Sequence, residues 1–245
     1  MFNSLLIVTR RELGAYFSTP LAYVFLVVFL MMCGFVTFEL GGFYSRNQAD
    51  LVPFFSYHPW LYLFLVPAIA MRVWAEERRS GSIELLLTLP LTLQATVVGK
   101  FLAAWLFVGL ALSLTFPVWL TVNYLGDPDN GAIAAAYIGS WLMAGAFLSV
   151  GCCLSATTKN QVIAFVMTVT LCFIFIVIGM APLAHSLGNV FPSFVVNVIA
   201  GLSLLDHFDA ITRGVLDVRD LLFYLLFIVC WLLAAGMVIE QKKAQ

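Results

Sequence analysis

The chain has 245 residues, of which 62% are hydrophobic and 10% are charged, and its formal net charge is −1. A soluble domain carries about 25% charged residues, so this composition excludes an ordinary water-soluble protein, and the small net charge argues against a nucleic-acid-binding surface. The five cysteines lie in apolar stretches, and no Cys or His spacing indicates a metal site or a disulfide framework. We therefore predict an all-α integral membrane protein.

Residues 1–19 have the spacing of an amphipathic helix. Apolar side chains at Leu5, Leu6, Leu13 and Tyr16 alternate with the charged run 10–12, so we expect a helix that lies along the membrane surface. The alternative is an unstructured basic leader that only sets topology. No short charged segment precedes a cleavable apolar run, so we also expect the first helix to remain in the mature protein.

Six segments are long and apolar enough to cross a bilayer, which needs about 20 mostly apolar residues. They are Leu21–Leu40, Phe54–Met71, Val97–Tyr124, Ala132–Ser155, Val162–Leu183 and Leu221–Ile239. Three prolines lie in or beside the second segment, which we interpret as a kinked span because neighbouring helices can satisfy the freed carbonyls. The sequence thus predicts six transmembrane helices in a single domain, 1–245.

The distribution of basic residues predicts the orientation, because Lys and Arg accumulate on the cytoplasmic side. With the N-terminus inside, nine basic residues lie on the cytoplasmic side and three outside. The inner set is Arg10, Arg11, Arg72, Arg78, Arg79, Lys100, Lys159, Lys242 and Lys243, and the outer set is Arg46, Arg213 and Arg219. We therefore expect a multi-pass protein of the bacterial inner membrane with both termini in the cytoplasm.

The fourth span carries small residues four positions apart, a pattern that lets helices approach closely in lipid. The pairs are Ala135 and Gly139, Ser140 and Ala144, and Gly145 and Ser149. We favour packing within the chain, and a dimer interface is the alternative.

The loop 75–96 is the most charged segment of the chain. Glu76, Glu77, Arg78, Arg79 and Glu84 precede an apolar group that ends at Pro90. This pattern predicts a short helix with one polar and one apolar face, which ends before the proline. Such a helix favours a protein partner, and a generic loop whose charges only prevent translocation is the alternative.

The segment 184–220 is expected outside, where its apolar run 191–205 is too short to cross. We predict that it re-enters the membrane or lies in the outer leaflet. Asp206, His207, Asp209 and Arg213 follow it before the last span. Carboxylate and imidazole groups can bind metals, but residues 206 and 207 diverge on a helix, so solvated surface charge is the better interpretation and no metal site is predicted.

The loop resembles the signature of ABC type-2 exporter permeases, in which an acidic-basic run, a glycine, a glutamate, leucines and a proline follow in order. The matching residues are Glu76, Glu77, Arg78, Gly81, Glu84, Leu86, Leu87 and Pro90. Residues 10–20 and 203–217 agree with the same pattern. Within that family the chain is most similar to the compact permeases of the gliding-motility type and of the type that accompanies nitrous oxide reductase maturation.

The resemblance implies a permease subunit of an ATP-driven exporter that binds a separate ATPase through the coupling residues 76–90. It implies a second permease copy, as a homodimer, or a related permease, and an accessory extracytoplasmic protein as a further partner. The chain has no GxxxxGK[ST] phosphate loop, so ATP and Mg²⁺ would belong to the partner and this chain would hold no cofactor and catalyse no reaction. Asp206, His207, Asp209 and Arg213 would lie at an external gate.

Three other classes remain as alternatives. An ion-driven secondary transporter would need ionisable residues at mid-membrane depth, and none is visible in the predicted spans. An intramembrane enzyme would need a nucleophile, base or metal cluster inside the bundle. A membrane anchor that only recruits or regulates an ATPase would share the same loop. The sequence does not select a substrate.

Overall fold

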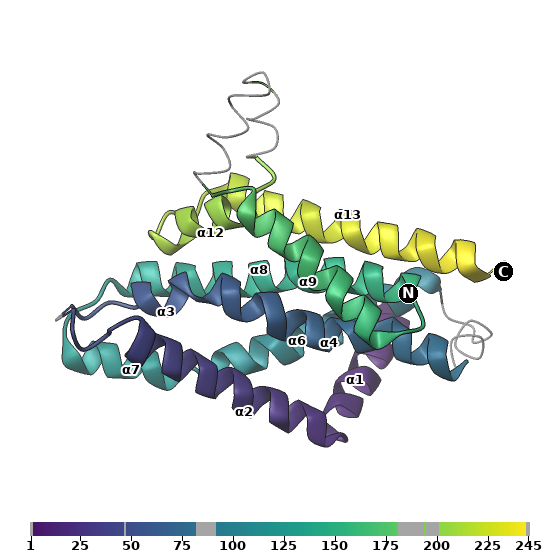
Figure 1. Ribbon diagram of the computed structural model, residues 1–245, viewed down its shortest axis with the longest axis horizontal. Helices are drawn as coiled ribbons and strands as arrows, with labels where there is room; N and C mark the ends of the chain where they lie inside the picture. The colour runs from purple at the N-terminus through teal and green to yellow at the C-terminus, as the bar shows by residue number, and fades with distance from the viewer. Residues whose placement is uncertain (1, 47, 82–91, 181–193, 195–200, 244–245) are drawn as a thin grey trace.

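The computed structural model is a bundle of long helices (Figure 1). It describes residues 2–46, 48–81, 92–180, 194 and 201–243, and these contain no strand. The helices are α1 (Phe2–Phe17), α2 (Pro20–Phe35) with its π-helical extension η1 (Val36–Leu40), α3 (Val52–Ser56), α4 (His58–Ser80), α6 (Leu93–Ser113), α7 (Phe116–Leu125), α8 (Asn130–Thr157), α9 (Gln161–Val177), α12 (Leu204–Thr212) and α13 (Val218–Lys243). Both termini lie at the same end of the bundle, which we call the termini end.

Four helical segments in the described part of the chain are long and apolar enough to span a membrane. They are Pro20–Leu40, Leu93–Leu125, Asn130–Thr157 and Val218–Lys242, and they coincide with the first, third, fourth and sixth predicted spans. The second predicted span corresponds to α4, whose last turns are charged, and α9 is a shorter apolar helix of 17 residues. The chain is a multi-pass membrane protein, and the count of six spans remains a prediction.

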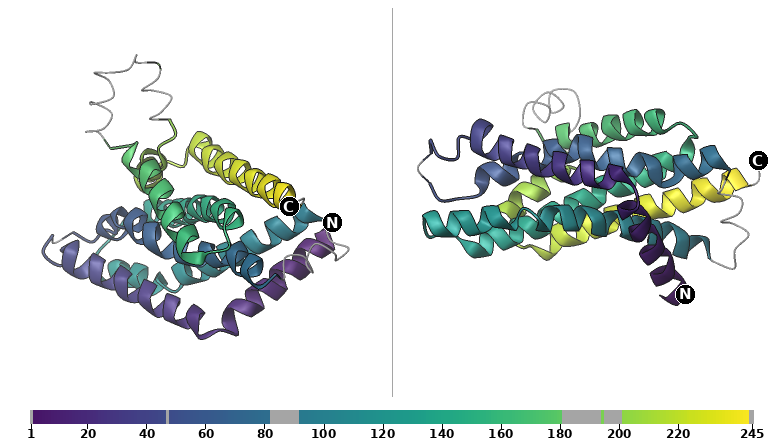
Figure 2. Two further views of the ribbon diagram at one scale, coloured as in Figure 1. Left: turned by 45° about the vertical axis from the view of Figure 1, so that its right-hand side comes forward. Right: turned by 90° about the horizontal axis from the view of Figure 1, so that it is seen from below.

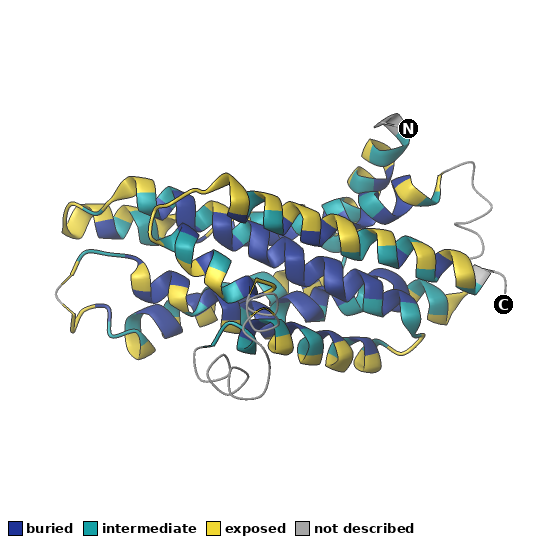
Figure 3. Ribbon diagram, turned by 90° about the horizontal axis from the view of Figure 1, so that it is seen from above, coloured by how far each residue is buried: buried dark blue, intermediate teal, exposed yellow. Residues whose placement is uncertain are grey.

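Helix α8 forms the centre of the bundle (Figure 3). In its membrane-length window 78% of the residues are buried, against 28% in α13, so α8 is enclosed by protein while α13 exposes most of its surface. The small residues of α8 explain the close packing: Gly139 lies against Ile211, and Gly145 lies against Trp105 and Ile228. The small-residue pattern therefore serves packing within the chain, as favoured from the sequence.

Two tryptophans join α6 to α8 reciprocally. The indole N–H of Trp105 donates to the carbonyl of Trp141 at 2.8 Å, and that of Trp141 donates to the carbonyl of Trp105 at 3.2 Å. Their rings stack with centroids 4.2 Å apart. Each indole also covers a glycine of the opposite helix, Gly145 or Gly109, where a Cβ would lie within 2.8 Å of the indole nitrogen.

Residues 2–17 form helix α1, so the unstructured-leader alternative is wrong. The helix leaves the bundle axis at an angle (Figure 2) and packs against α6. Thr9 donates to the carbonyl of Gly99 at 3.3 Å, and Tyr16 stacks on Phe107 with ring centroids 5.2 Å apart. Its opposite face exposes Leu6 and Ile7, as expected for a helix at a membrane surface.

Candidate coupling site and outer pocket

The charged run that begins the predicted coupling loop is the end of helix α4. Glu76, Glu77, Arg78 and Arg79 continue the helix without a break, and it ends at Gly81. Gly81 has φ +73°, a left-handed conformation that glycine adopts without the penalty of a Cβ. Any displacement of the residues after Gly81 therefore acts on the end of a bundle helix.

Lys100 of α6 is buried in an ion triad at this end. Its ammonium lies 2.6 Å from Glu77 of α4 and 3.0 Å from Glu12 of α1, and only 4% of the lysine side chain is exposed. It also lies over the ring of Trp74, 5.5 Å from the centroid. One cation thus connects three helices that come from different parts of the chain.

The environment of Glu77 opposes its charge. Burial raises the pKa of the Glu77 carboxyl above the ordinary value of glutamate, and the ammonium of Lys100 acts in the opposite direction. Desolvation of the carboxylate therefore outweighs the attraction of the nearby cation. The charged form of Glu77 is therefore unfavourable in the folded chain. Carboxyl groups with shifted pKa values are common at functional sites.

The other charges of the run have different surroundings. Glu76 forms an ion pair with Arg72 one turn earlier, at 2.9 Å. Arg78 points inward and donates to the carbonyl of Ala156 at the C-terminus of α8, and Lys242 of α13 donates to the next carbonyl, Thr157. Cations are favourable at a helix C-terminus. Arg79 lies on the exposed side.

The structure brings together part of the predicted site. Glu76, Glu77, Arg78, Arg79 and Gly81 form the end of α4, whereas Glu84, Leu86, Leu87 and Pro90, with the predicted helix before the proline, lie outside the described residues. Sequence reasoning missed Glu12 and Lys100 as partners of Glu77. A single lysine three residues inside a predicted span was the available signal, because a charge in an apolar segment needs a partner.

The four predicted gate residues separate in space. All lie on or next to α12, but Nδ1 of His207 donates to Asp220 of α13 at 2.6 Å, and its ring stacks on Phe223. Asp206 is exposed on another face. Asp209 and Arg213 instead line a pocket with α3 and α8. Among the described residues no group of three or more His, Cys, Asp or Glu side chains could hold a metal.

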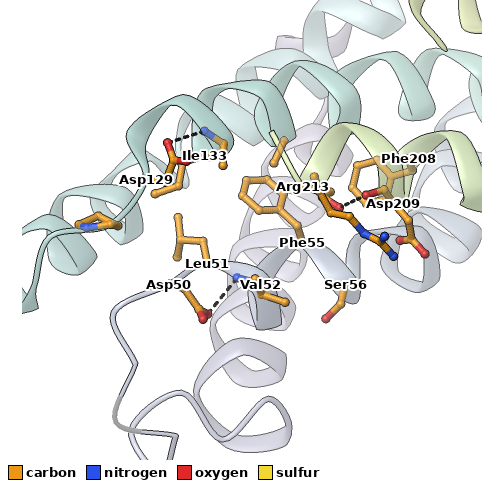
Figure 4. A pocket seen from close by; sticks show the side chains of 14 residues that line it. Asp50, Leu51, Val52, Phe55, Ser56, Asp129, Ile133, Phe208, Asp209 and Arg213 are labelled. Carbon is orange, nitrogen blue, oxygen red and sulfur yellow. Dashed lines mark hydrogen bonds between the residues drawn. The ribbon is translucent and has the colours of Figure 1, made fainter. Parts of the chain in front are cut away.

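This outer pocket, drawn from close by in Figure 4, lies between α3, α8 and α12, away from the end of the bundle that carries the termini (Figure 1). Its volume is about 570 Å³. Buried apolar residues from three elements form its floor, and charged residues form its rim. The floor consists of Leu51, Phe55, Ile133, Ala136 and Phe208, and the rim carries Asp50, Asp129, Asp209 and Arg213.

The helical bundle and its membrane-length apolar helices define a multi-pass membrane protein. Residues 62–239 match the family model described as "ABC-2 family transporter protein". This match covers more than half of the chain, so the chain belongs to the ABC-2 transporter family and is a permease subunit of the ABC transporter class.

Two curated relatives are similar over part of the chain. Heme exporter protein B of Paracoccus denitrificans is 32% identical over 142 residues, which are 56% of this chain and 59% of the relative. Heme exporter protein B of Rhodobacter capsulatus is 28% identical over 148 residues, which are 56% of this chain and 62% of the relative. The chain thus spans about three fifths of the length of these relatives.

Proposed function

We propose that this chain is the permease subunit of an ATP-driven exporter, which receives motion from a separate ATPase at the end of α4 and transmits it to the bundle. The termini end is then cytoplasmic, and the outer pocket opens on the opposite side. Two permease copies pair with two ATPase subunits, which hold the ATP and Mg²⁺. Residues 206–213 take part in an outer gate.

One observation supports this proposal most directly. The run Glu76–Arg79 is continuous with α4, and Glu77 lies 2.6 Å from Lys100 of α6. A force applied to residues 82–91 therefore reaches α4 through its backbone and α6 through a short ion pair. Because packed helices move as rigid elements, such a displacement is transmitted along the bundle.

Docking is tested by reversing one exposed charge at the end of α4 together with one charge of the loop that follows it. Arg79 is exposed, whereas Arg78 contacts Ala156, so the test variant is Arg79→Glu combined with Glu84→Lys. The purified variant is mixed with the ABC ATPase that associates with the native chain, and association and ATP hydrolysis are measured. We expect loss of both, since rim charges set the orientation of an interface.

The matched control is Lys159→Glu, which reverses an exposed charge on the turn between α8 and α9 at the same end. It should leave association and hydrolysis unchanged. If the double variant also binds the ATPase and supports hydrolysis as the native chain does, the coupling proposal is wrong. A membrane anchor would associate with the ATPase but move no compound in sealed vesicles.

The same vesicles test the cargo. Both relatives are named heme exporter protein B, so heme is the first compound to test as a cargo in these vesicles. ATP-dependent accumulation of heme, followed by its absorbance, would identify it as a cargo. Absence of accumulation together with retained ATPase binding would direct the search to other compounds.

A further inference from the structure

The outer pocket has the shape of a ligand site. Its volume of about 570 Å³ falls within the range of about 300–1,000 Å³ that is usual for small-molecule sites. The floor is closed by Phe55, Ile133 and Phe208, which are 0–5% exposed. A compound with an apolar body can therefore pack against this floor and lose its contact with water. The apolar surface that is buried in this way contributes to binding.

The rim favours a positive charge. Three carboxylates, Asp50, Asp129 and Asp209, and one guanidinium, Arg213, line the opening; Arg46 lies 3.7 Å from Asp50, so the net charge is −2 among the lining residues and −1 with Arg46 included. Two of the carboxylates are held by backbone contacts: Asp129 accepts from the N–H groups of Gly131 and Ala132, and Asp50 accepts from that of Val52. Their positions are thus fixed before any ligand arrives, which reduces the entropy cost of binding.

We propose that this pocket binds an amphipathic cation, with an apolar body against Phe55, Ile133 and Phe208 and a positive head between Asp50 and Asp129. The site lies far from the coupling charges, at the opposite end of the bundle (Figures 1 and 4). It is formed by α3, α8 and α12, so a ligand there joins the central helix of the bundle to the short helix α12. This inference is independent of ATPase coupling, because binding is a property of the chain alone.

Two probes of one shape and opposite charge test the proposal. Tetraphenylphosphonium is an apolar cation, and tetraphenylborate is an anion of nearly the same size. Binding of each to the purified full chain in lipid nanodiscs is measured by calorimetry, with empty nanodiscs subtracted. We expect saturable binding of tetraphenylphosphonium, and no saturable binding of tetraphenylborate.

The key variant is Asp50→Asn combined with Asp129→Asn. Asparagine retains the oxygen that accepts from the backbone at both positions and is an equally good N-cap at position 129, so the fold is kept while two charges are removed. Affinity for tetraphenylphosphonium should fall about tenfold or more, as expected for the loss of two charges close to a cation. Asp127→Asn is the matched control, since this exposed aspartate lies in the same turn but does not line the pocket, and it should bind like the native chain.

A second variant, Ile133→Trp, fills the pocket with a bulky side chain and should abolish binding. The proposal is overturned if tetraphenylborate binds as tightly as tetraphenylphosphonium, or if the Asp50/Asp129 variant retains native affinity. Should Ile133→Trp fail to fold, the asparagine pair still decides the outcome because it preserves both backbone contacts.

Discussion

Lys100 and Glu77 come from different helices and meet at 2.6 Å at the termini end of the bundle. The lysine is 4% exposed, so its charge depends on the carboxylates of Glu77 and Glu12 rather than on water. Helix α1, which leaves the bundle at an angle, is thereby tied to the same cation as α4. Helix α1 and the charged end of α4 are therefore joined through one buried cation.

Replacing Lys100 by methionine should destabilise the chain strongly. The substitution removes the ammonium that lies 2.6 Å from Glu77 and 3.0 Å from Glu12, and breaking a buried ion pair on one side costs about 3 kcal/mol or more. Thermal unfolding of the purified chain measures this loss. Lys159→Met, which removes an exposed lysine, is the control and should leave the unfolding temperature nearly unchanged.

The double variant Lys100→Met with Glu77→Gln sharpens this prediction. Removal of the second charge should restore part of the lost stability, because one of the two carboxylates that contact Lys100 is then neutral. If the double variant is less stable than the native chain by the sum of the two single effects, the ion triad does not couple these residues.

The raised pKa of Glu77 predicts a pH dependence of stability. A carboxyl with a folded-state pKa above its unfolded value binds its proton more tightly when folded, so its contribution is most favourable at low pH and falls as the pH rises from the ordinary glutamate value through the folded value. The difference in unfolding temperature between the native chain and Glu77→Gln should therefore change across this window and become constant above it. A flat difference over the whole range would contradict the shift.

The sequence predicts elements whose cause is local and misses contacts made at a distance. The apolar lengths of the first, third, fourth and sixth spans were sufficient to place them, because lipid requires about 20 apolar residues in each. The continuity of α4 through Ser80 was not foreseen, since the charged run read as a separate loop. A helix can continue past the membrane because Arg72 and Glu76 support one another a turn apart.

The candidate site shows the same division. The charged run 76–79 was visible as a pattern, but its partners were not, because Glu12 and Lys100 lie 65 and 23 positions from Glu77 in the chain. Likewise, Asp209 and Arg213 were grouped with His207 by proximity in sequence. The side chains divide between the outer pocket and the contact with Asp220 because neighbouring residues on a helix point about 100° apart.

The position of Trp105 over Gly145 predicts a loss of stability when this glycine is replaced. A methyl group at Gly145 would lie 2.7 Å from the indole nitrogen of Trp105 and 3.0 Å from the side chain of Ile228, so two side chains would have to move at once. Gly145→Ala should lower stability by about 1–3 kcal/mol, as overpacking of a core does. Urea or thermal unfolding in detergent measures the change.

Gly236→Ala provides the control for this prediction. Gly236 lies in α13 with no described atom within 4 Å of the added carbon, and alanine is the better helix former by about 1 kcal/mol. The control variant should be as stable as the native chain or more stable. Equal effects at Gly145 and Gly236 would show that backbone propensity, and not the indole contact, determines the outcome.

Gly81 connects the fold to the proposed coupling most directly. With φ +73°, alanine at this position costs about 1–2 kcal/mol in the left-handed conformation, and helix α4 would avoid this strain by continuing or by ending elsewhere. Either change alters the direction in which the chain leaves α4, and under the proposed coupling this weakens the contact with the ATPase. Gly81→Ala should therefore reduce permease-stimulated ATP hydrolysis several-fold with a small loss of stability, while Gly81→Asn, which tolerates this conformation better, should retain most of the stimulation.

Gly14→Ala in α1, at a glycine with no positive φ and open space around it, should leave hydrolysis unchanged. Equal stimulation by the Gly81 alanine and asparagine variants would show that the direction in which the chain leaves α4 has no part in coupling.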